Sequence, residues 1–212
     1  MEITTKKQLA IFLSRLKGFE KPKTKLEQYP TESDFAAEIA WNAFYRREIE
    51  GKTVADLGCG TGILGISMLL SGAKKVFFID IDEESLAIAK ENVAFAEEAL
   101  DVELMDNAVF VAQDVKNVDE KVDLVVQNPP FGIQGKTHAD REFLEAAFRM
   151  GKIIYSFHTT ESGKFIKSIA KDNGFVIDGY WEFDWPLKQT MEHHKKKIQY
   201  IKVGCWRMEK HS

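Results

Sequence analysis

The most informative residues form the tetrapeptide Asn128-Pro129-Pro130-Phe131, which follows an apolar run at 122–127. The amino group of a nucleobase is a poor nucleophile, because its lone pair is drawn into the aromatic ring. The Asn128 side-chain oxygen and the Pro129 carbonyl can accept its two hydrogens, and neither proline offers a competing N–H. Pro130 biases Pro129 toward extended geometry, and the Phe131 ring offers a surface for stacking of a base. The tetrapeptide therefore predicts methylation of a planar exocyclic amine, with a Pro-Pro turn and an aromatic plug as the alternative.

A glycine cluster made of Gly58, Gly60 and Gly62 is the second candidate site. It follows a short apolar run and precedes residues 63–70, whose apolar spacing is helical. The three glycines let the backbone turn tightly and let a ligand lie against bare main chain beside a helix N-terminus. The preceding Asp56 would repel a pyrophosphate but suits a ligand with an ammonium group. S-adenosylmethionine has such a group and NAD does not, so this loop predicts S-adenosylmethionine as the cofactor.

Further carboxylates stand at the ends of the next two predicted strands. Asp80 follows Gly58 by 22 positions, close to the spacing at which an acid binds ribose hydroxyls in nucleotide folds, so it is the expected ribose ligand. Asp82 can share this role or cap the helix that follows, and its position favours capping. Asp114 is expected to meet the adenine amino group, with Gln113 or Val115 lining the ring. An exposed strand-end carboxylate is the alternative for Asp114.

Four of these blocks resemble the successive motifs of class I S-adenosylmethionine-dependent methyltransferases, at residues 56–62, 78–82, 113–114 and 128–131. Three flanking segments, at residues 26–31, 155–158 and 194–197, are similar to the methyltransferase-like protein five family of small-subunit ribosomal RNA N6-adenosine methyltransferases and their archaeal homologues. The resemblance implies transfer of a methyl group from S-adenosylmethionine to the N6 amine of an adenosine in RNA. Small-subunit ribosomal RNA is the expected substrate.

The resemblance also implies residue roles and a partner. It assigns Gln28, Tyr29 and Thr31 to the methionine end of the cofactor, and it places Ile81 and Asn128 in the cofactor site. A helix start is an alternative explanation of the Q-Y-P-T turn, and the two explanations are compatible. The implied partner is a small zinc-binding activator protein that joins the methyltransferase by strand addition.

The distribution of charge bears on the expected RNA substrate. The formal net charge of −4 argues against a nucleic-acid-binding protein, but the C-terminal part of the chain has the positive excess that phosphates need. Lys195, Lys196 and Lys197 are the densest positive cluster, and we expect them to contact RNA, with a solvated loop as the alternative. Tyr155 is expected to line the base pocket together with Phe131.

Predicted strands and helices alternate along most of the chain. Strands are expected at 52–57, 75–80, 108–113, 122–127, 152–158, 174–183 and 198–207, and helices at 6–17, 34–45, 62–71, 83–99, 138–149 and 161–173. With the resemblance, this alternation predicts an α/β, Rossmann-like sheet of seven strands, mostly parallel with an antiparallel edge strand and helices on both faces. We expect residues 1–25 to form an N-terminal helix and connector, and residues 26–212 a single methyltransferase domain.

Composition limits the number of domains, the location of the protein and the roles of its cysteines. With 212 residues, of which 44% are hydrophobic, the chain can bury the core of one domain. No apolar run approaches the roughly 18 residues of a membrane span and no signal peptide is visible, so a cytoplasmic location without membrane contact is expected. Cys59 and Cys205 have neither C-x-x-C spacing nor a matching histidine cluster, so neither a metal site nor a disulfide is expected.

Three other functions are compatible with parts of the sequence. Guanine N2 methylation of RNA would use the same Asn-Pro-Pro-Phe chemistry. A protein glutamine methyltransferase also acts on a planar amide amine, but such enzymes typically carry Tyr where Phe131 stands. A non-catalytic S-adenosylmethionine-binding scaffold would keep the fold and lose the site. The presence of Asp56, Asp80, Asp114 and Asn128 disfavours this last alternative.

Overall fold

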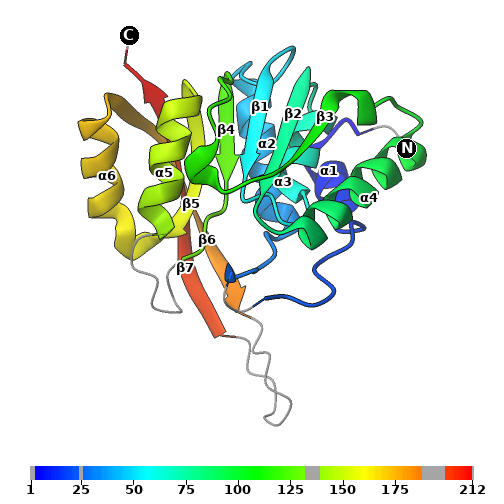
Figure 1. Cartoon of the computed structure of the whole chain (residues 1–212), viewed down its shortest axis with the longest axis horizontal. Helices are drawn as coiled ribbons and strands as arrows, with labels where there is room; N and C mark the ends of the chain where they lie inside the picture. The colour runs from blue at the N-terminus through cyan, green and yellow to red at the C-terminus, as the bar shows by residue number, and fades with distance from the viewer. Residues whose placement is uncertain (1–2, 24–25, 132–138, 188–198, 212) are drawn as a thin grey trace.

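One sheet of seven strands forms the centre of the described part of the protein (Figure 1). The structure, a computed structural model, describes residues 3–23, 26–131, 139–187 and 199–211. The strands are β1 (Thr53–Leu57), β2 (Lys75–Asp80), β3 (Ala108–Ala112), β4 (Leu124–Gln127), β5 (Ile153–Thr159), β6 (Phe175–Leu187) and β7 (Gln199–Lys210). Their order in the sheet is β3-β2-β1-β4-β5-β7-β6, and within this sheet β7 alone runs opposite to the other six strands. The predicted seven-stranded, mostly parallel sheet is confirmed.

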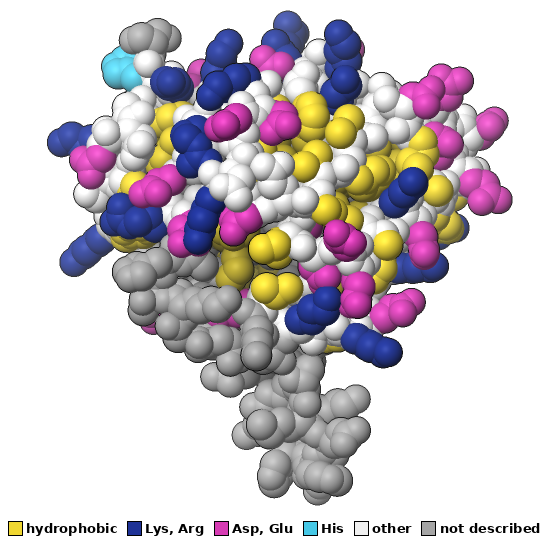
Figure 2. Space-filling view, viewed as in Figure 1, with side chains coloured by type: hydrophobic (Ala, Val, Ile, Leu, Met, Phe, Trp, Pro, Cys, Tyr) yellow, Lys and Arg dark blue, Asp and Glu magenta, His cyan; other side chains and the backbone are white. Residues whose placement is uncertain are grey.

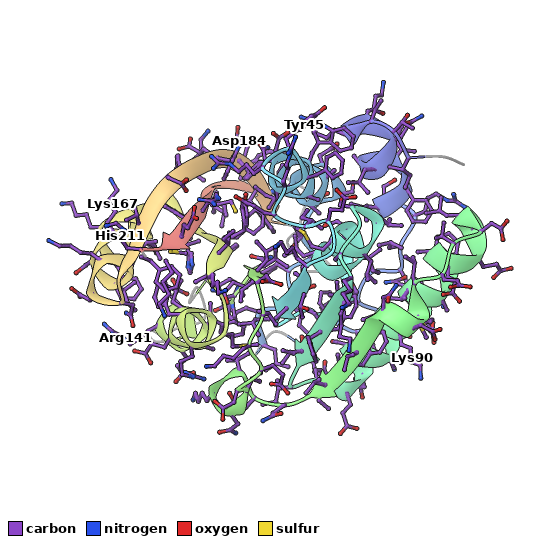
Figure 3. The ribbon with its side chains drawn as sticks, turned by 90° about the horizontal axis from the view of Figure 1, so that it is seen from above. Tyr45, Lys90, Arg141, Lys167, Asp184 and His211 are labelled. Atoms are coloured by element: carbon purple, nitrogen blue, oxygen red, sulfur yellow. The ribbon has the colours of Figure 1, made fainter. Side chains whose placement is uncertain are left out.

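Helices cover both faces of this sheet. The helices are α1 (Lys6–Leu13), α2 (Ser33–Tyr45), α3 (Ile63–Leu70), α4 (Glu83–Leu100), α5 (Ala139–Met150) and α6 (Gly163–Asp172), with short 3₁₀ helices η2 (Met105–Asn107), η3 (Val115–Asn117) and η4 (Thr160–Ser162). Buried side chains of α1 to α4 form one apolar cluster with the sheet, and those of α5 and α6 form a second. Figure 3 shows Tyr45 on α2 and Arg141 on α5 on opposite sides of the sheet.

The central strands are mostly apolar, as expected for strands whose two faces are both covered. In β4, Leu124 and Val126 belong to the cluster with α1 to α4, whereas Val125 belongs to the cluster with α5 and α6. This alternation buries every residue of the strand. Because β1, β2, β3 and β4 are parallel, their carboxyl ends lie at one edge of the sheet, where ligands bind in open α/β folds.

The C-terminal strands β6 and β7 lie at one lateral side of the sheet, opposite β3. The predicted antiparallel strand is β7, which lies one position in from the edge, and β6 is the edge strand itself. β6 continues through Trp185 and Pro186, which we expected to lie in a connector. An edge strand tolerates a proline because one of its sides has no hydrogen-bonded neighbour. Trp185 is buried in the cluster with α1 to α4, which anchors this extension.

The N-terminal segment is tied to the rest of the fold. α1 ends at Leu13 rather than at the predicted residue 17, with Ser14 as its C-cap. The chain then contacts α4, where the Lys17 N–H donates to Asn92 Oδ1 at 2.8 Å and Asn92 Nδ2 donates to the Lys17 carbonyl at 3.0 Å. This docking brings the segment that follows to the carboxyl ends of the strands.

Candidate active site

A cavity of about 280 Å³ lies at the carboxyl ends of β1, β2, β3 and β4. Loops after all four strands line it, together with the segment that precedes α2. The predicted site residues in its lining are Gln28, Tyr29, Thr31, Asp56, Gly58, Gly60, Asp80, Ile81, Asp114, Val115, Asn128 and Pro130. The structure therefore brings together residues that the sequence spreads over about a hundred positions.

The glycine loop between β1 and α3 contains residues in left-handed conformation. Gly58 and Gly60 have φ angles of 64° and 52°, a region that residues with a Cβ rarely adopt. A Cβ on Gly58 would lie 2.7 Å from the Phe143 ring, and a Cβ on Gly60 would lie 2.6 Å from the Phe19 ring. The loop thus requires glycine at both positions and presents bare main chain to the cavity.

Asp56 is buried on β1 beneath the glycine loop. It is 1% exposed, and its Oδ2 accepts a hydrogen bond from the Gly65 N–H of α3 at 2.7 Å. Burial raises the pKa of Asp56 to about 7; the hydrogen bond from Gly65 opposes this shift, and the nearby Asp80 carboxylate adds to it. A cation that enters the cavity therefore stabilises the charged form of Asp56.

Asp80, at the end of β2, organises the loop and lines the cavity. Its Oδ2 accepts a hydrogen bond from the Gly60 N–H at 2.8 Å, and its Oδ1 accepts one from the Asp82 N–H at 2.9 Å. Burial raises the pKa of Asp80, while these backbone hydrogen bonds lower it. Asp82 caps α4 by accepting from the Glu84 N–H at 3.3 Å, which confirms the capping prediction.

Asp114 and Val115 form the part of the cavity wall that follows β3. Asp114 is the N-cap of η3, and its Oδ1 accepts a hydrogen bond from the Lys116 N–H at 3.0 Å. Val115 is buried in the cluster with α5 and α6. Their expected contacts with the adenine end of the cofactor stay predictions.

The segment before α2 forms another wall of the cavity. The Gln28 amide donates to Asp82 Oδ2 at 2.7 Å and to Ser85 Oγ at 3.1 Å, and its oxygen accepts from the Lys23 N–H at 2.7 Å. The Lys23 ammonium also pairs with Asp82 at 2.7 Å. These contacts hold Gln28, Tyr29 and Thr31 in the cavity lining.

The end of β4 presents an unusual amide to the cavity. Asn128 Nδ2 donates a hydrogen bond to Thr31 Oγ1 at 3.0 Å. Asn128 Oδ1 is buried and accepts no hydrogen bond from the described residues. A buried acceptor without a partner costs roughly 1–3 kcal/mol, so it is rare unless a ligand uses it. Gln127 Oε1 is likewise buried without a partner among the described residues, but of the two residues only Asn128 lines the cavity.

The other residues of the tetrapeptide are arranged differently. Pro130 lines the cavity, whereas Pro129 is buried and Phe131 is half-buried outside the lining. The Phe131 ring packs edge-on against Trp185 at 5.6 Å between centroids. Phe131 is therefore held beside the cavity rather than inside it.

Two of the predicted site residues serve the core instead. Tyr155 is fully buried in the middle of β5, and its hydroxyl donates to Glu48 Oε2 at 2.7 Å, so the predicted RNA contact at Tyr155 is wrong. Gly62 does not line the cavity as predicted. It is the N-cap of α3, and a Cβ there would lie 3.0 Å from Ala89 Cβ on α4. Its φ of 86° is left-handed, so both the backbone conformation and the packing against α4 favour glycine here.

The remaining predicted RNA contacts, Lys195, Lys196 and Lys197, lie outside the described residues.

Among the lining residues that the sequence motifs did not predict are Phe19, Glu142 and Phe143. Phe19 comes from the connector after α1, and the other two come from the first turns of α5. No local motif marks them, because each reaches the cavity only through the docking of its element.

A buried polar chain positions the start of α5. Gln127 Nε2 donates to Ser156 Oγ at 2.8 Å, which lies 2.6 Å from His158 Nε2, and His158 Nδ1 lies 3.4 Å from Asp140 Oδ2. This chain ties the last residue of β4 to the helix that carries Phe143.

Fold and cavity together have the arrangement of class I methyltransferases that the sequence motifs predicted. The chain belongs to the methyltransferase small domain family, whose sequence model matches residues 30–152. It is 33% identical to the rRNA N6-adenosine-methyltransferase Mettl5 of Drosophila melanogaster, over 96% of this chain and 95% of the fly protein. It is 35% identical to the rRNA N6-adenosine-methyltransferase METTL5 of Danio rerio, over 93% of this chain and 95% of that protein. These relatives confirm the predicted resemblance.

Solved structures lead to the same class. A candidate RNA methyltransferase from Pyrococcus horikoshii superposes with a TM-score of 0.87 at 38% identity, over 98% of this chain and 99% of that chain. The magnesium protoporphyrin IX methyltransferase of Synechocystis was solved with bound S-adenosylmethionine. It has a TM-score of 0.64 at 18% identity, over 84% of this chain and 78% of that chain. At that identity the second likeness concerns the fold alone.

Proposed function

We propose that this chain transfers a methyl group from S-adenosylmethionine to the N6 amine of an adenosine in RNA, with small-subunit ribosomal RNA as the substrate. The proposal rests chiefly on Asn128 Oδ1, which has no partner among the described residues and belongs to an Asn-Pro-Pro-Phe sequence at the cavity. Relatives of 31–35% identity over more than nine tenths of the chain are named as rRNA N6-adenosine methyltransferases.

The cavity lining fits the chemistry of S-adenosylmethionine. Asp56 provides a carboxylate for an ammonium group, and Asp80 provides one for ribose hydroxyls. The bare main chain at Gly58 and Gly60 allows close approach of a ligand, and Ile81, 59% exposed, offers apolar surface to the adenine ring. When bound, S-adenosylmethionine supplies a methyl group on a positively charged sulfur.

The end of β4 orients the target amine. Asn128 Oδ1 accepts one amine hydrogen and the Pro129 carbonyl accepts the other, so that the nitrogen lone pair is localised for attack. Because the methyl donor is already a strong electrophile, positioning and electrostatic alignment provide most of the catalysis, and the proton leaves after transfer. Phe131, fixed against Trp185, supports the base, which must leave its stack to reach the site.

The surface charge of the protein bears on where a nucleic-acid substrate would bind. On the face shown in Figure 2, acidic side chains gather over the end that carries α4, whereas Lys and Arg side chains are mixed with acidic ones over α5 and α6. The backbone of RNA would be repelled by the acidic helix α4 and would therefore bind away from it. Contacts of Lys195, Lys196 and Lys197 with RNA remain part of this proposal.

The product of the purified protein tests the proposal. Small-subunit ribosomal RNA is incubated with protein and isotopically labelled S-adenosylmethionine, and its nucleosides are separated by mass spectrometry. Labelled N6-methyladenosine is the expected product. Labelled N2-methylguanosine would establish the guanine alternative instead, and cofactor binding without transfer to RNA or to protein glutamine would favour the scaffold alternative.

Cofactor affinity is expected to depend on pH through Asp56. Its raised pKa of about 7 means that below pH 7 a proton must leave before the carboxylate can bind an ammonium group. The dissociation constant of S-adenosylmethionine should therefore rise about tenfold between pH 7.5 and pH 6. Calorimetric titration checks this, with Asp56→Asn as the control that should bind weakly at both pH values. A constant affinity of the wild type across this range would contradict the role of Asp56.

An activator partner and a cytoplasmic location also belong to this proposal. A zinc-binding activator that adds a strand has two open edges to pair with in the described sheet, at β3 and at β6. Across the described ranges, no helix is both long and apolar enough to cross a membrane. Co-expression with such a partner should raise methylation activity if the strand-addition prediction holds.

A further inference from the structure

The Asn128 amide is held at only one of its two ends. Within the described part of the chain, its Nδ2 donates to Thr31 Oγ1 at 3.0 Å and its Oδ1 has no partner. The two ends of a primary amide have nearly the same shape, so packing cannot decide which of them faces the substrate. The hydrogen bond with Thr31 distinguishes them when the hydroxyl hydrogen of Thr31 is engaged elsewhere, because the hydroxyl can then only accept from Nδ2.

Thr31 is well placed to make this selection. It is 8% exposed, lines the cavity, and follows the segment that Gln28 fastens to Asp82. A hydroxyl has one hydrogen and two lone pairs, so Thr31 can accept from Asn128 while its own hydrogen serves an acceptor in the cavity, such as a carboxylate. If Thr31 donated to Asn128 instead, the amide would turn its N–H groups toward a target amine that also donates.

We propose that Thr31 is a positioning residue that orients the Asn128 amide with its oxygen toward the target amine. This inference rests on the proposed transfer to adenine N6 and adds a residue on which that transfer depends. Thr31 and Asn128 are 97 positions apart in the chain, and their contact joins the N-terminal wall of the cavity to the end of β4. The amide is therefore correctly oriented only when that wall is in place.

Replacement of the hydroxyl tests this role. Thr31→Val removes the hydroxyl at nearly the same shape, Thr31→Ala removes it at smaller volume, and Thr31→Ser retains it. Methyl transfer to ribosomal RNA is measured in a single turnover at saturating cofactor and RNA, so that weaker binding does not affect the rate. We expect Thr31→Val and Thr31→Ala to lower the rate about 10- to 100-fold and Thr31→Ser to remain within about threefold of the wild type.

A double variant separates positioning from a general structural effect. If Thr31 acts through Asn128, adding Thr31→Val to Asn128→Ala should cause no further loss of rate. Losses that multiply would overturn this proposal, as would a wild-type rate in Thr31→Val, and both would leave the proposed N6 transfer standing. A wild-type protein that methylates no adenine N6 would overturn the proposed function, and this inference with it.

Discussion

Replacing Asn128 with alanine is expected to slow methyl transfer by about 10²- to 10³-fold while the cofactor still binds. Alanine removes the one buried oxygen of the cavity that no described residue satisfies, and with it the acceptor that localises the lone pair of the amine. Loss of a preorganised hydrogen-bonding group at a reacting centre typically has an effect of this size. Single-turnover transfer to ribosomal RNA measures the rate, and calorimetry measures the dissociation constant of S-adenosylmethionine, which should change less than about threefold.

A matched control removes an amide elsewhere. Asn42 lies on α2 outside the cavity lining, where its amide donates to the Glu38 carbonyl at 2.8 Å. Asn42→Ala should therefore transfer methyl groups at the wild-type rate. If Asn128→Ala also kept a rate within about threefold of the wild type, Asn128 would not orient the amine.

Replacing Arg207 with methionine is expected to lower the free energy of unfolding by about 3–5 kcal/mol. Arg207 is 2% exposed, and its Nε and Nη2 donate to Glu48 Oε1 at 3.0 and 2.6 Å. It also binds Asp178 and Glu209, and Glu48 accepts the hydroxyl of Tyr155. Methionine fills much of the space but leaves the Glu48 carboxylate buried without its cation, which is the costly part of the change.

Urea-induced unfolding measures this loss against an exposed ion pair. Lys202 lies on the same strand and pairs with Asp184 at 2.8 Å, with both side chains more than half exposed. Lys202→Met should cost less than about 1 kcal/mol. Adding Glu48→Gln to Arg207→Met should recover part of the stability, because it removes the unpaired charge. If Arg207→Met lowered the free energy of unfolding by less than about 1 kcal/mol, the burial of the Glu48 carboxylate would not depend on its pairing with Arg207.

Much of the cavity was predictable because its signals are local in the sequence. Asp80 and Asn128 directly end or follow apolar runs, and in a parallel sheet such positions meet at one edge whatever the details of packing. The glycine loop is equally local, since Gly58 and Gly60 adopt a backbone conformation that few other residues can adopt. The strands and helices also lie close to their predicted ranges, because hydrophobic periodicity is a local signal as well.

The features that were missed depend on packing between distant segments. Strand alternation places Tyr155 on one face of β5 but does not reveal that Glu48 and Arg207 lie on that face, so a core tyrosine was taken for a substrate contact. Phe19 and Phe143 reach the glycine loop only through the docking of the connector and of α5. No sequence spacing encodes such contacts.

The central claim is that the oxygen of Asn128 prepares an adenine N6 amine in ribosomal RNA for methylation. Its most direct test maps modified nucleotides in ribosomal RNA from cells that lack this protein and from the same cells complemented with the wild type or with Asn128→Ala. We predict that one N6-methyladenosine disappears in the deletion, returns with the wild type and stays absent with Asn128→Ala. An unchanged modification map, or a lost mark on guanine N2 instead, would contradict the claim.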